Sequence, residues 1–139
     1  MFLKPSITFN GQAEEALNFY KSVFNAQIVN LCRYGEAPAS PQLSTLNEQE
    51  KQLIMNVRLD FGANKFNISD SLPNRKVSFG SNIKIDLTFA IEEEVKPIFD
   101  KLAEGGEITL PLVTTFFSPN FGELIDKFGI HWSFMQMPE

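Results

Sequence analysis

The chain has 139 residues, with 17 acidic against 12 basic side chains and a formal net charge of −5 at pH 7. A chain of this length is expected to form a single domain, 1–139, around one core. The acidic balance, without any block of Lys or Arg, argues against nucleic acids and anionic membranes as partners. No apolar run reaches the roughly 20 residues of a membrane span or the length of a signal peptide, so we expect a cytoplasmic protein.

The first half of the chain predicts a strand, a helix and three further strands. The first strand is expected over 3–9, and Asn10 is a plausible N-cap for a helix that ends near Asn25, a residue able to adopt the left-handed conformation. Apolar residues at spacings of three and four form the buried stripe of this helix: Ala13, Ala16, Leu17, Tyr20, Val23 and Phe24. Strands should follow over 27–34, 53–61 and 64–69. The segment 35–52, rich in Pro, Ser and Gln, is expected to be a loop.

The same order of patterns returns about eighty residues later. Leu87-Thr88-Phe89 repeats Ile7-Thr8-Phe9, and a second helical stripe follows, made of Val95, Ile98, Phe99, Leu102 and Ala103. Pro97 requires this helix to start late or to kink, and Gly105-Gly106 ends it. Strands are expected over 107–114, 123–127 and 130–135.

This duplication predicts an α+β fold. Two tandem β-α-β-β-β modules are expected over 2–70 and 83–136, with 71–82 as the connector. We expect the two modules to form one partly open mixed barrel with the helices outside. Such a pair of half-domains differs from a solenoid, which needs three or more repeats.

Alternation along the strands separates a helix-facing side from an opposite, polar side. In the strand expected over 53–61 the helix-facing set is apolar: Met55, Val57, Leu59 and Phe61. The opposite set is polar: Asn56, Arg58 and Asp60. The matching face of the second module carries Asp86, His131 and Ser133. These polar sets should line the inner cup of the barrel.

Several stretches, in this order and spacing, resemble one known family. They are Ile7-Thr8-Phe9-Asn10-Gly11, Glu14-Glu15-Ala16-Leu17-Asn18-Phe19-Tyr20, Tyr34-Gly35-Glu36-Ala37-Pro38, Ile54-Met55-Asn56-Val57-Arg58-Leu59, Phe121-Gly122 and Asp126-Lys127-Phe128-Gly129-Ile130-His131-Trp132. The chain is similar to the vicinal-oxygen-chelate superfamily of glyoxalase, bleomycin-resistance and dioxygenase proteins, and within it to the PhnB-like branch. Some members of that branch carry the label 3-demethylubiquinone-9 3-methyltransferase. The chain lacks the glycine-rich strand-to-helix turn that binds a nucleotide-like methyl donor, so the label has no support in the residues.

The resemblance implies a position for a metal site. The metalloenzymes of the superfamily hold a divalent ion with a pair of side chains from each module, and these positions correspond here to Pro5, Asn56, Asp86 and Ser133. Only Asp86 is a good metal ligand, because an amide oxygen is a poor substitute for imidazole with a transition metal. Three of the four positions therefore lack a good metal ligand, and no cofactor is expected.

The ligand-binding candidates are Asn56, Arg58, Asp86 and Ser133. The guanidinium of Arg58 could hold a carboxylate or a phosphate in bidentate fashion, or it could form an internal ion pair with Asp60. Asp70 is a strand-end acid to which the pattern assigns no partner.

We therefore expect a small-molecule-binding protein whose cup takes a small organic or anionic molecule, and we expect it to be dimeric by analogy with relatives of this size. The expected assembly is a homodimer. The alternative is a divalent-metal-dependent isomerase, lyase or dioxygenase in which Asp86, Glu123 and His131 form a non-standard site. His131, the single histidine, has the titration range of a general base, and Glu123 could act as an acid near the cup mouth. Both residues also have a purely structural interpretation. His131 would be a hydrogen-bonded histidine within a strand, and Glu123 would be a solvated glutamate at the start of a strand.

Overall fold

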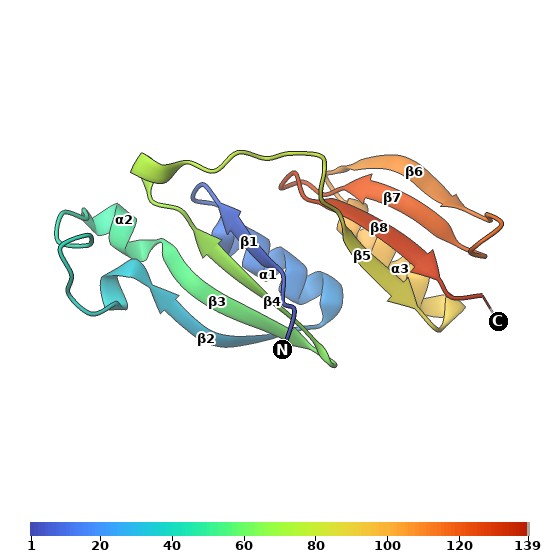
Figure 1. The fold of residues 1–139 in the computed structure, drawn as a ribbon, viewed down its shortest axis with the longest axis horizontal. Coiled ribbons are helices and arrows are strands. Elements are labelled where there is room, and N and C mark those ends of the chain that lie inside the picture. Colours follow the sequence, from blue (N-terminus) through green and yellow to red (C-terminus); the bar gives the residue numbers. More distant parts are fainter. Residues whose placement is uncertain (139) are drawn as a thin grey trace. The chain divides into compact units, whose positions relative to one another are not determined.

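The structure is a computed structural model that describes residues 1–138. The chain divides into two compact units, Met1–Ser78 and a second that begins at Phe79. Each unit contains one four-stranded mixed sheet with a long helix against one face (Figure 1). The boundary between the units lies inside the segment 71–82 that the sequence marks as a connector.

The first unit follows the predicted order. Its strands are β1 (Ser6–Phe9), β2 (Gln27–Arg33), β3 (Ile54–Phe61) and β4 (Asn64–Asp70), and its long helix is α1 (Ala13–Phe24). Shorter helical segments are η1 (Tyr34–Glu36), α2 (Glu48–Gln52) and η2 (Pro73–Arg75). The sheet order is β1-β4-β3-β2, with β1 parallel to β4 and the other neighbours antiparallel.

The second unit repeats this topology. Its elements are β5 (Ile85–Phe89), α3 (Glu92–Ala103), β6 (Glu107–Val113), β7 (Phe121–Ile125) and β8 (His131–Gln136). The sheet order is β5-β8-β7-β6, again with one parallel pair, β5 and β8, at an edge. The α+β class and the two tandem β-α-β-β-β modules are therefore confirmed. Both sheets are open, and a single barrel built from the two remains a prediction.

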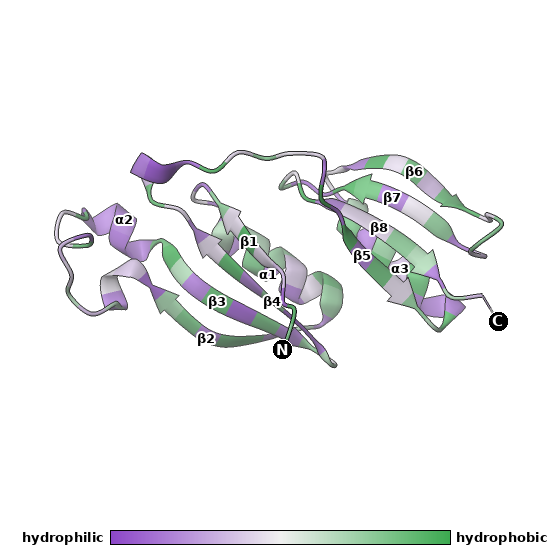
Figure 2. Ribbon diagram, viewed as in Figure 1, coloured by the Kyte–Doolittle hydropathy of each residue, from purple (hydrophilic) through white to green (hydrophobic). Residues whose placement is uncertain are grey.

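One face of each sheet is covered by its helix. In the first unit the buried side of α1, which includes Leu17 and Tyr20, packs with the inward residues of the sheet: Phe9, Val57, Leu59, Phe66 and Ile68. In the second unit the buried residues are Val95, Phe99 and Leu102 on α3, with Phe89, Leu124, Trp132 and Phe134 on the strands. Along β3, hydrophobic and hydrophilic residues alternate, as Figure 2 shows. The polar side chains are thus left on the face opposite the helix.

The start of α1 differs from the expectation. Asn10 is not the N-cap: the helix begins at Ala13, and Gln12 occupies the cap position without a side-chain hydrogen bond. Asn25 does end the helix in the left-handed conformation, with φ 49°, as predicted. The end of a helix is a local property of its own residues, whereas the start here is fixed by a residue far away in the sequence.

That residue is Asp70, at the end of β4. Its carboxylate is buried, and Oδ1 accepts hydrogen bonds from the backbone N–H groups of Gly11 at 2.9 Å and Ala13 at 3.0 Å. Its Oδ2 accepts from the N–H of Ile54 at 3.1 Å, while the Tyr34 hydroxyl donates to the Asp70 carbonyl at 2.7 Å. The expectation that Asp70 has no partner is wrong. Asp70 supplies the cap that the residues preceding α1 do not supply.

The predicted loop 35–52 contains the short helix α2. Asn47 caps it: its side chain accepts a hydrogen bond from the N–H of Glu50 at 2.8 Å, and the carboxylate of Glu50 accepts one from the N–H of Asn47 at 3.4 Å. This reciprocal arrangement is a capping box, and its spacing of three residues was present in the sequence.

The register of β3 also differs at its first residues. Ile54 is fully buried whereas Met55 is half-buried. The pairing of β2 with β3 shifts where Cys32 faces Asn56 and Arg33 faces Ile54, so strict alternation fails at this end of the strand.

In the second unit α3 begins at Glu92, well before Pro97. A late start is therefore wrong, and the helix continues through a residue that cannot donate to the carbonyl of Glu93.

No helix within residues 1–138 combines the length and the hydropathy that a membrane crossing requires.

The role of Asp70 yields a stability prediction. Asp70→Ala should lower the free energy of unfolding by about 3 kcal/mol, because it leaves two buried backbone N–H groups, of Ala13 and Ile54, and the partly buried N–H of Gly11 without acceptors. Asp100→Asn is the matched control, since Asp100 makes only an exposed pair with Lys96 on α3, and its change should stay within about 0.5 kcal/mol. Urea unfolding followed by circular dichroism measures both. Equal effects of the two substitutions would contradict the assigned role.

Candidate functional site

The polar face of each sheet carries a row of side chains that crosses three neighbouring strands. In the first unit, Ser6 on β1 is paired with Asn67 on β4, which is paired with Arg58 on β3. We call this set, Ser6, Asn67 and Arg58, the first row. Strand alternation places it opposite α1, because the adjacent residues Ile7, Ile68 and Val57 are buried beneath the helix.

The second unit has an equivalent row. Asp86 on β5 is paired with Ser133 on β8, which is paired with Glu123 on β7. We call Asp86, Ser133 and Glu123 the second row. Because the two sheets have the same strand order, Ser6 corresponds to Asp86, Asn67 to Ser133, and Arg58 to Glu123.

This correspondence adds one residue to those expected at the site. Asn56, one of the four positions that the family resemblance implied, lies on β3, is exposed, and faces Cys32 on β2. The register places Asn67 at the position equivalent to Ser133. Pro5, the other expected position in this module, lies one residue before Ser6 and accepts a hydrogen bond from the N–H of Asn67 at 2.9 Å.

Sequence reasoning missed Asn67. Its side-chain oxygen Oδ1 is buried and has no hydrogen-bond partner within residues 1–138. A buried acceptor without a donor is uncommon and costly, so it points to a donor that the protein itself does not supply. The available signal was the alternation along Asn64–Asp70, which places Asn67 on the same face as Arg58.

Arg58 forms the internal ion pair with Asp60 that the sequence left as one of two possibilities. Nε donates to Oδ1 at 2.6 Å and Nη2 donates to Oδ2 at 3.0 Å, and both side chains are partly exposed. The hydrogen bond from Arg58 lowers the pKa of the Asp60 carboxyl and raises the pKa of the guanidinium. These contacts use two of the five N–H groups of an arginine, so the others remain available to an acceptor.

Both carboxylates of the second row accept hydrogen bonds from neighbouring side chains. The Ser133 hydroxyl donates to the Asp86 carboxylate, and Lys84 donates to the Glu123 carboxylate at 2.5 Å. Glu123 lies in the middle of β7 and is only partly exposed, so the reading as a solvated strand-entry residue is wrong. Both carboxylates of the row are held by neighbours on the same face.

His131 lies on β8, two residues from Ser133, and faces Ile125 on β7. No hydrogen bond joins it to another side chain of the described chain. A general base normally has a second group that orients its ring, and the side chains near His131 provide none.

Aromatic side chains flank the second row. Phe121 precedes Glu123 on the same face of β7 and is paired with Met135 on β8. The Phe117 ring lies 5.0 Å from that of Phe121, and the Phe116 ring lies 5.1 Å from that of Phe117. Phe116 is fully exposed. This face therefore offers an apolar surface next to its polar row.

The donors on these faces do not fit a divalent transition-metal site. Within either unit, no three side chains from His, Cys, Asp and Glu among residues 1–138 are grouped closely enough to hold one ion. The first row supplies a hydroxyl, an amide and a cation, and the cation would repel a metal. In the second row, Asp86 and Glu123 already have hydrogen-bond donors.

The family model described as 3-demethylubiquinone-9 3-methyltransferase matches residues 2–135. The chain belongs to this PhnB-like family. It is 30% identical over 137 residues to Protein YjdN of Escherichia coli, covering 95% of this chain and 92% of YjdN. The resemblance inferred from the sequence motifs is thereby confirmed.

Solved structures agree with the family. Protein PA1353 from Pseudomonas aeruginosa superposes with a TM-score of 0.86 at 27% identity, covering 100% of this chain and 99% of PA1353. A PhnB protein from Bacillus cereus, described as a putative 3-demethylubiquinone-9 3-methyltransferase, gives a TM-score of 0.77 at 31% identity, with 98% and 99% covered.

A more distant neighbour shares the fold alone. It is a mutant of the fosfomycin resistance protein FosX from Listeria monocytogenes, solved with Mn(II) and 1S,2S-dihydroxypropylphosphonic acid. Its TM-score is 0.68 at 11% identity, and the match covers 99% of this chain and 92% of FosX. The PhnB-like chain thus has the vicinal-oxygen-chelate fold.

The Arg58–Asp60 contact gives a prediction that depends on pH. The lowered pKa of Asp60 means that this pair stabilises the fold above the ordinary aspartate pKa of about 3.9, and that the contribution is lost as the pH falls through the lowered value. Arg58→Ala should raise the pKa of Asp60 towards the ordinary value, and Arg58→Lys should raise it less. Carboxyl carbon NMR measures the titration. Lys65→Ala is the control, because Lys65 is a weaker cause of the same shift, and a larger effect there would contradict the assignment.

Proposed function

We propose that this PhnB-like protein binds a small organic anion on the polar face of its first unit. The observation that carries the proposal is the buried, unpartnered Oδ1 of Asn67 beside Arg58 in the first row. The unused N–H groups of Arg58 suit a carboxylate, phosphate or phosphonate. A hydroxyl or amine on the same molecule would supply the donor that Asn67 lacks. The first row therefore favours an anion that also carries a hydrogen-bond donor.

Asp86 and Ser133 are proposed as ligand contacts on the polar face of the second unit. On that face Phe121 and Met135 add apolar surface, which suits the uncharged part of a small organic molecule. Asn56 is proposed as a peripheral contact, since it is exposed near one end of β3. A homodimer also remains a prediction.

The alternative is a metal-dependent enzyme that uses Asp86, Glu123 and His131. Its support is the fold shared with FosX, which was solved with Mn(II). The binding proposal is favoured because Asp86 and Glu123 already accept hydrogen bonds from Ser133 and Lys84. Methyl transfer is not proposed, since the two mixed sheets lack the parallel doubly wound arrangement of a nucleotide-binding fold.

The proposed loss of the metal site is testable. After dialysis, the protein purified without a histidine tag should hold no stoichiometric transition metal, and added Ni or Zn should produce no glyoxalase-type turnover. Elemental analysis and a turnover assay measure these outcomes. About one tightly held metal per chain, lost in Asp86→Ala, would overturn the proposal and favour the enzyme.

The proposed anion site predicts a specific loss of binding. With 1S,2S-dihydroxypropylphosphonic acid as the probe, Arg58→Ala should weaken binding by about tenfold or more, because a hydrogen bond to a charged group is removed. The melting temperature should change by only a few degrees, since Arg58 lies outside the helix-facing core. Calorimetric titration and thermal unfolding measure the two quantities.

Two controls separate the row from general charge effects. Lys65→Ala removes a positive charge from β4, where Lys65 is paired with Asp60, and should change the affinity less than about threefold. Propylphosphonic acid, which lacks the hydroxyls, should bind the unmodified protein more weakly than the probe does. The two compounds should bind Asn67→Ala with equal affinity. Probe binding that is unchanged in Arg58→Ala would contradict the proposal.

A further inference from the structure

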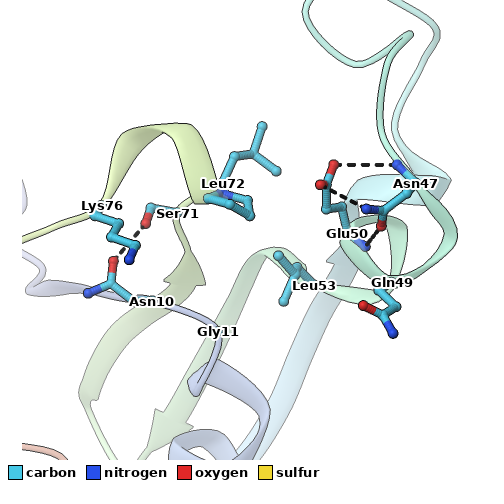
Figure 3. Close-up of a pocket in the computed structure, with 10 residues that line it drawn as sticks. Asn10, Gly11, Asn47, Gln49, Glu50, Leu53, Ser71, Leu72 and Lys76 are labelled. Atoms are coloured by element: carbon cyan, nitrogen blue, oxygen red, sulfur yellow. Dashed lines mark hydrogen bonds between the residues drawn. The ribbon is translucent and has the colours of Figure 1, made fainter.

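A pocket of about 310 Å³ lies at one end of the first unit, away from the first row (Figure 3). It is formed by the turn between β1 and α1, by the region of α2, and by the segment that follows β4. Ten residues line it: Asn10, Gly11, Asn47, Gln49, Glu50, Leu53, Ser71, Leu72, Pro73 and Lys76. A volume of this size lies at the lower end of the range for small-molecule sites.

One wall of the pocket is the segment after β4, and Asn10 holds it in place. The Asn10 amide donates to the carbonyl of Val77 at 2.9 Å, and its Oδ1 accepts from the N–H of Val77 at 2.9 Å and from the Ser71 hydroxyl at 3.1 Å. Asn10 therefore forms hydrogen bonds with Ser71 and Val77, the two ends of the stretch that contains Leu72 and Lys76. This is the role of the residue that the sequence indicated as a helix cap.

The opposite wall is α2, which is fixed at both ends. At its start the side chains of Asn47 and Glu50 form the capping box. At its end Arg33 donates to the carbonyl of Gln52 at 2.7 Å, and the N–H of Tyr34 donates to the carbonyl of Leu53 at 3.0 Å. Hydrogen bonds thus hold this wall at both ends of α2, which favours a preformed pocket.

Charges of opposite sign lie on the two sides of this pocket. Figure 3 shows Lys76 beside Asn10 and Ser71 on one side, Glu50 beside Asn47 on the other, and Leu72 and Leu53 between them. Lys76 forms no ion pair within residues 1–138. The Glu50 carboxylate accepts hydrogen bonds only from Asn47 in the described chain and retains unused lone pairs.

We propose that this pocket binds a small zwitterion whose anionic and cationic groups are separated by a short apolar chain. The anionic group contacts the ammonium of Lys76, the cationic group contacts the carboxylate of Glu50, and the apolar chain packs against Leu53 and Leu72. Amino acids with the two charges at opposite ends belong to this class. The site is independent of Arg58 and of the anion site on the polar face.

The test uses 6-aminohexanoate as the probe, with hexanoate and hexylamine as ligands that each lack one charge. Calorimetric titration should give the zwitterion an affinity at least about tenfold higher than either ligand. In amide NMR spectra, the shifted signals should come from the lining residues. No binding of the zwitterion at about 10 mM, or equal binding of all three compounds, would overturn the proposal.

Variants locate the two charge contacts. Lys76→Gln should reduce the affinity for 6-aminohexanoate to that of hexylamine, and Glu50→Gln should reduce it to that of hexanoate. Glutamine at position 50 keeps an acceptor for the capping box, so α2 should persist. Arg75→Gln and Glu48→Gln are matched controls, because neither residue lines the pocket, and both should leave the affinity unchanged. In Arg58→Ala the amide signals of the lining residues should still shift with 6-aminohexanoate to the same extent, which separates this site from the anion site.

Discussion

The buried carboxylate of Asp70 is the contact on which the first unit depends. It links the end of β4 to the start of α1 through Gly11 and Ala13, and to the start of β3 through Ile54. A buried carboxylate is stable only when hydrogen bonds replace its hydration, and these backbone N–H groups do so. Because β4 is the central partner of β1 and β3, this contact fixes the register that brings Ser6, Asn67 and Arg58 into one row.

The second unit uses a different polar anchor for the same topology. Asp126 lies in the turn between β7 and β8, where Oδ1 accepts from the N–H groups of Phe128 at 2.8 Å and Ile130 at 3.1 Å. Its Oδ2 accepts from the indole N–H of Trp132 at 2.8 Å. The duplicated units therefore share their helix-to-sheet packing but not the hydrogen bonds that organise their turns. Apolar packing is set by a simple periodicity, while each buried polar group needs its own partners.

The two equivalent rows have diverged in the same way. Arg58 in one unit corresponds to Glu123 in the other, so the two sheets present opposite charges at the same position. Arg58 pairs with Asp60 but keeps N–H groups for an anion, whereas the Glu123 carboxylate pairs with Lys84 and the Asp86 carboxylate accepts from the Ser133 hydroxyl. This difference is the reason that the proposed anion site is placed on the first row.

Local patterns in the sequence were sufficient for the repeated modules. The helical stripes predicted α1 and α3, alternation separated Val57 and Leu59 from Arg58 and Asp60, and Asn25 predicted the end of α1. These features depend on neighbours a few residues apart, so one sequence contains the information.

Only the tertiary structure decided which distant residues meet. Asp70 caps a helix that begins 57 residues earlier in the chain. Asn10, which does not cap this helix, instead forms hydrogen bonds with the backbone of Val77. Asn67 shares a row with Ser6 and Arg58, which the sequence did not indicate, because strand register decides which side chains share a row. Strand pairing is a contact between remote segments, and a shift of one residue moves every side chain to the other face. The sequence by itself therefore determined the modules and their polar faces, whereas the rows, the cap and the pocket required the folded chain.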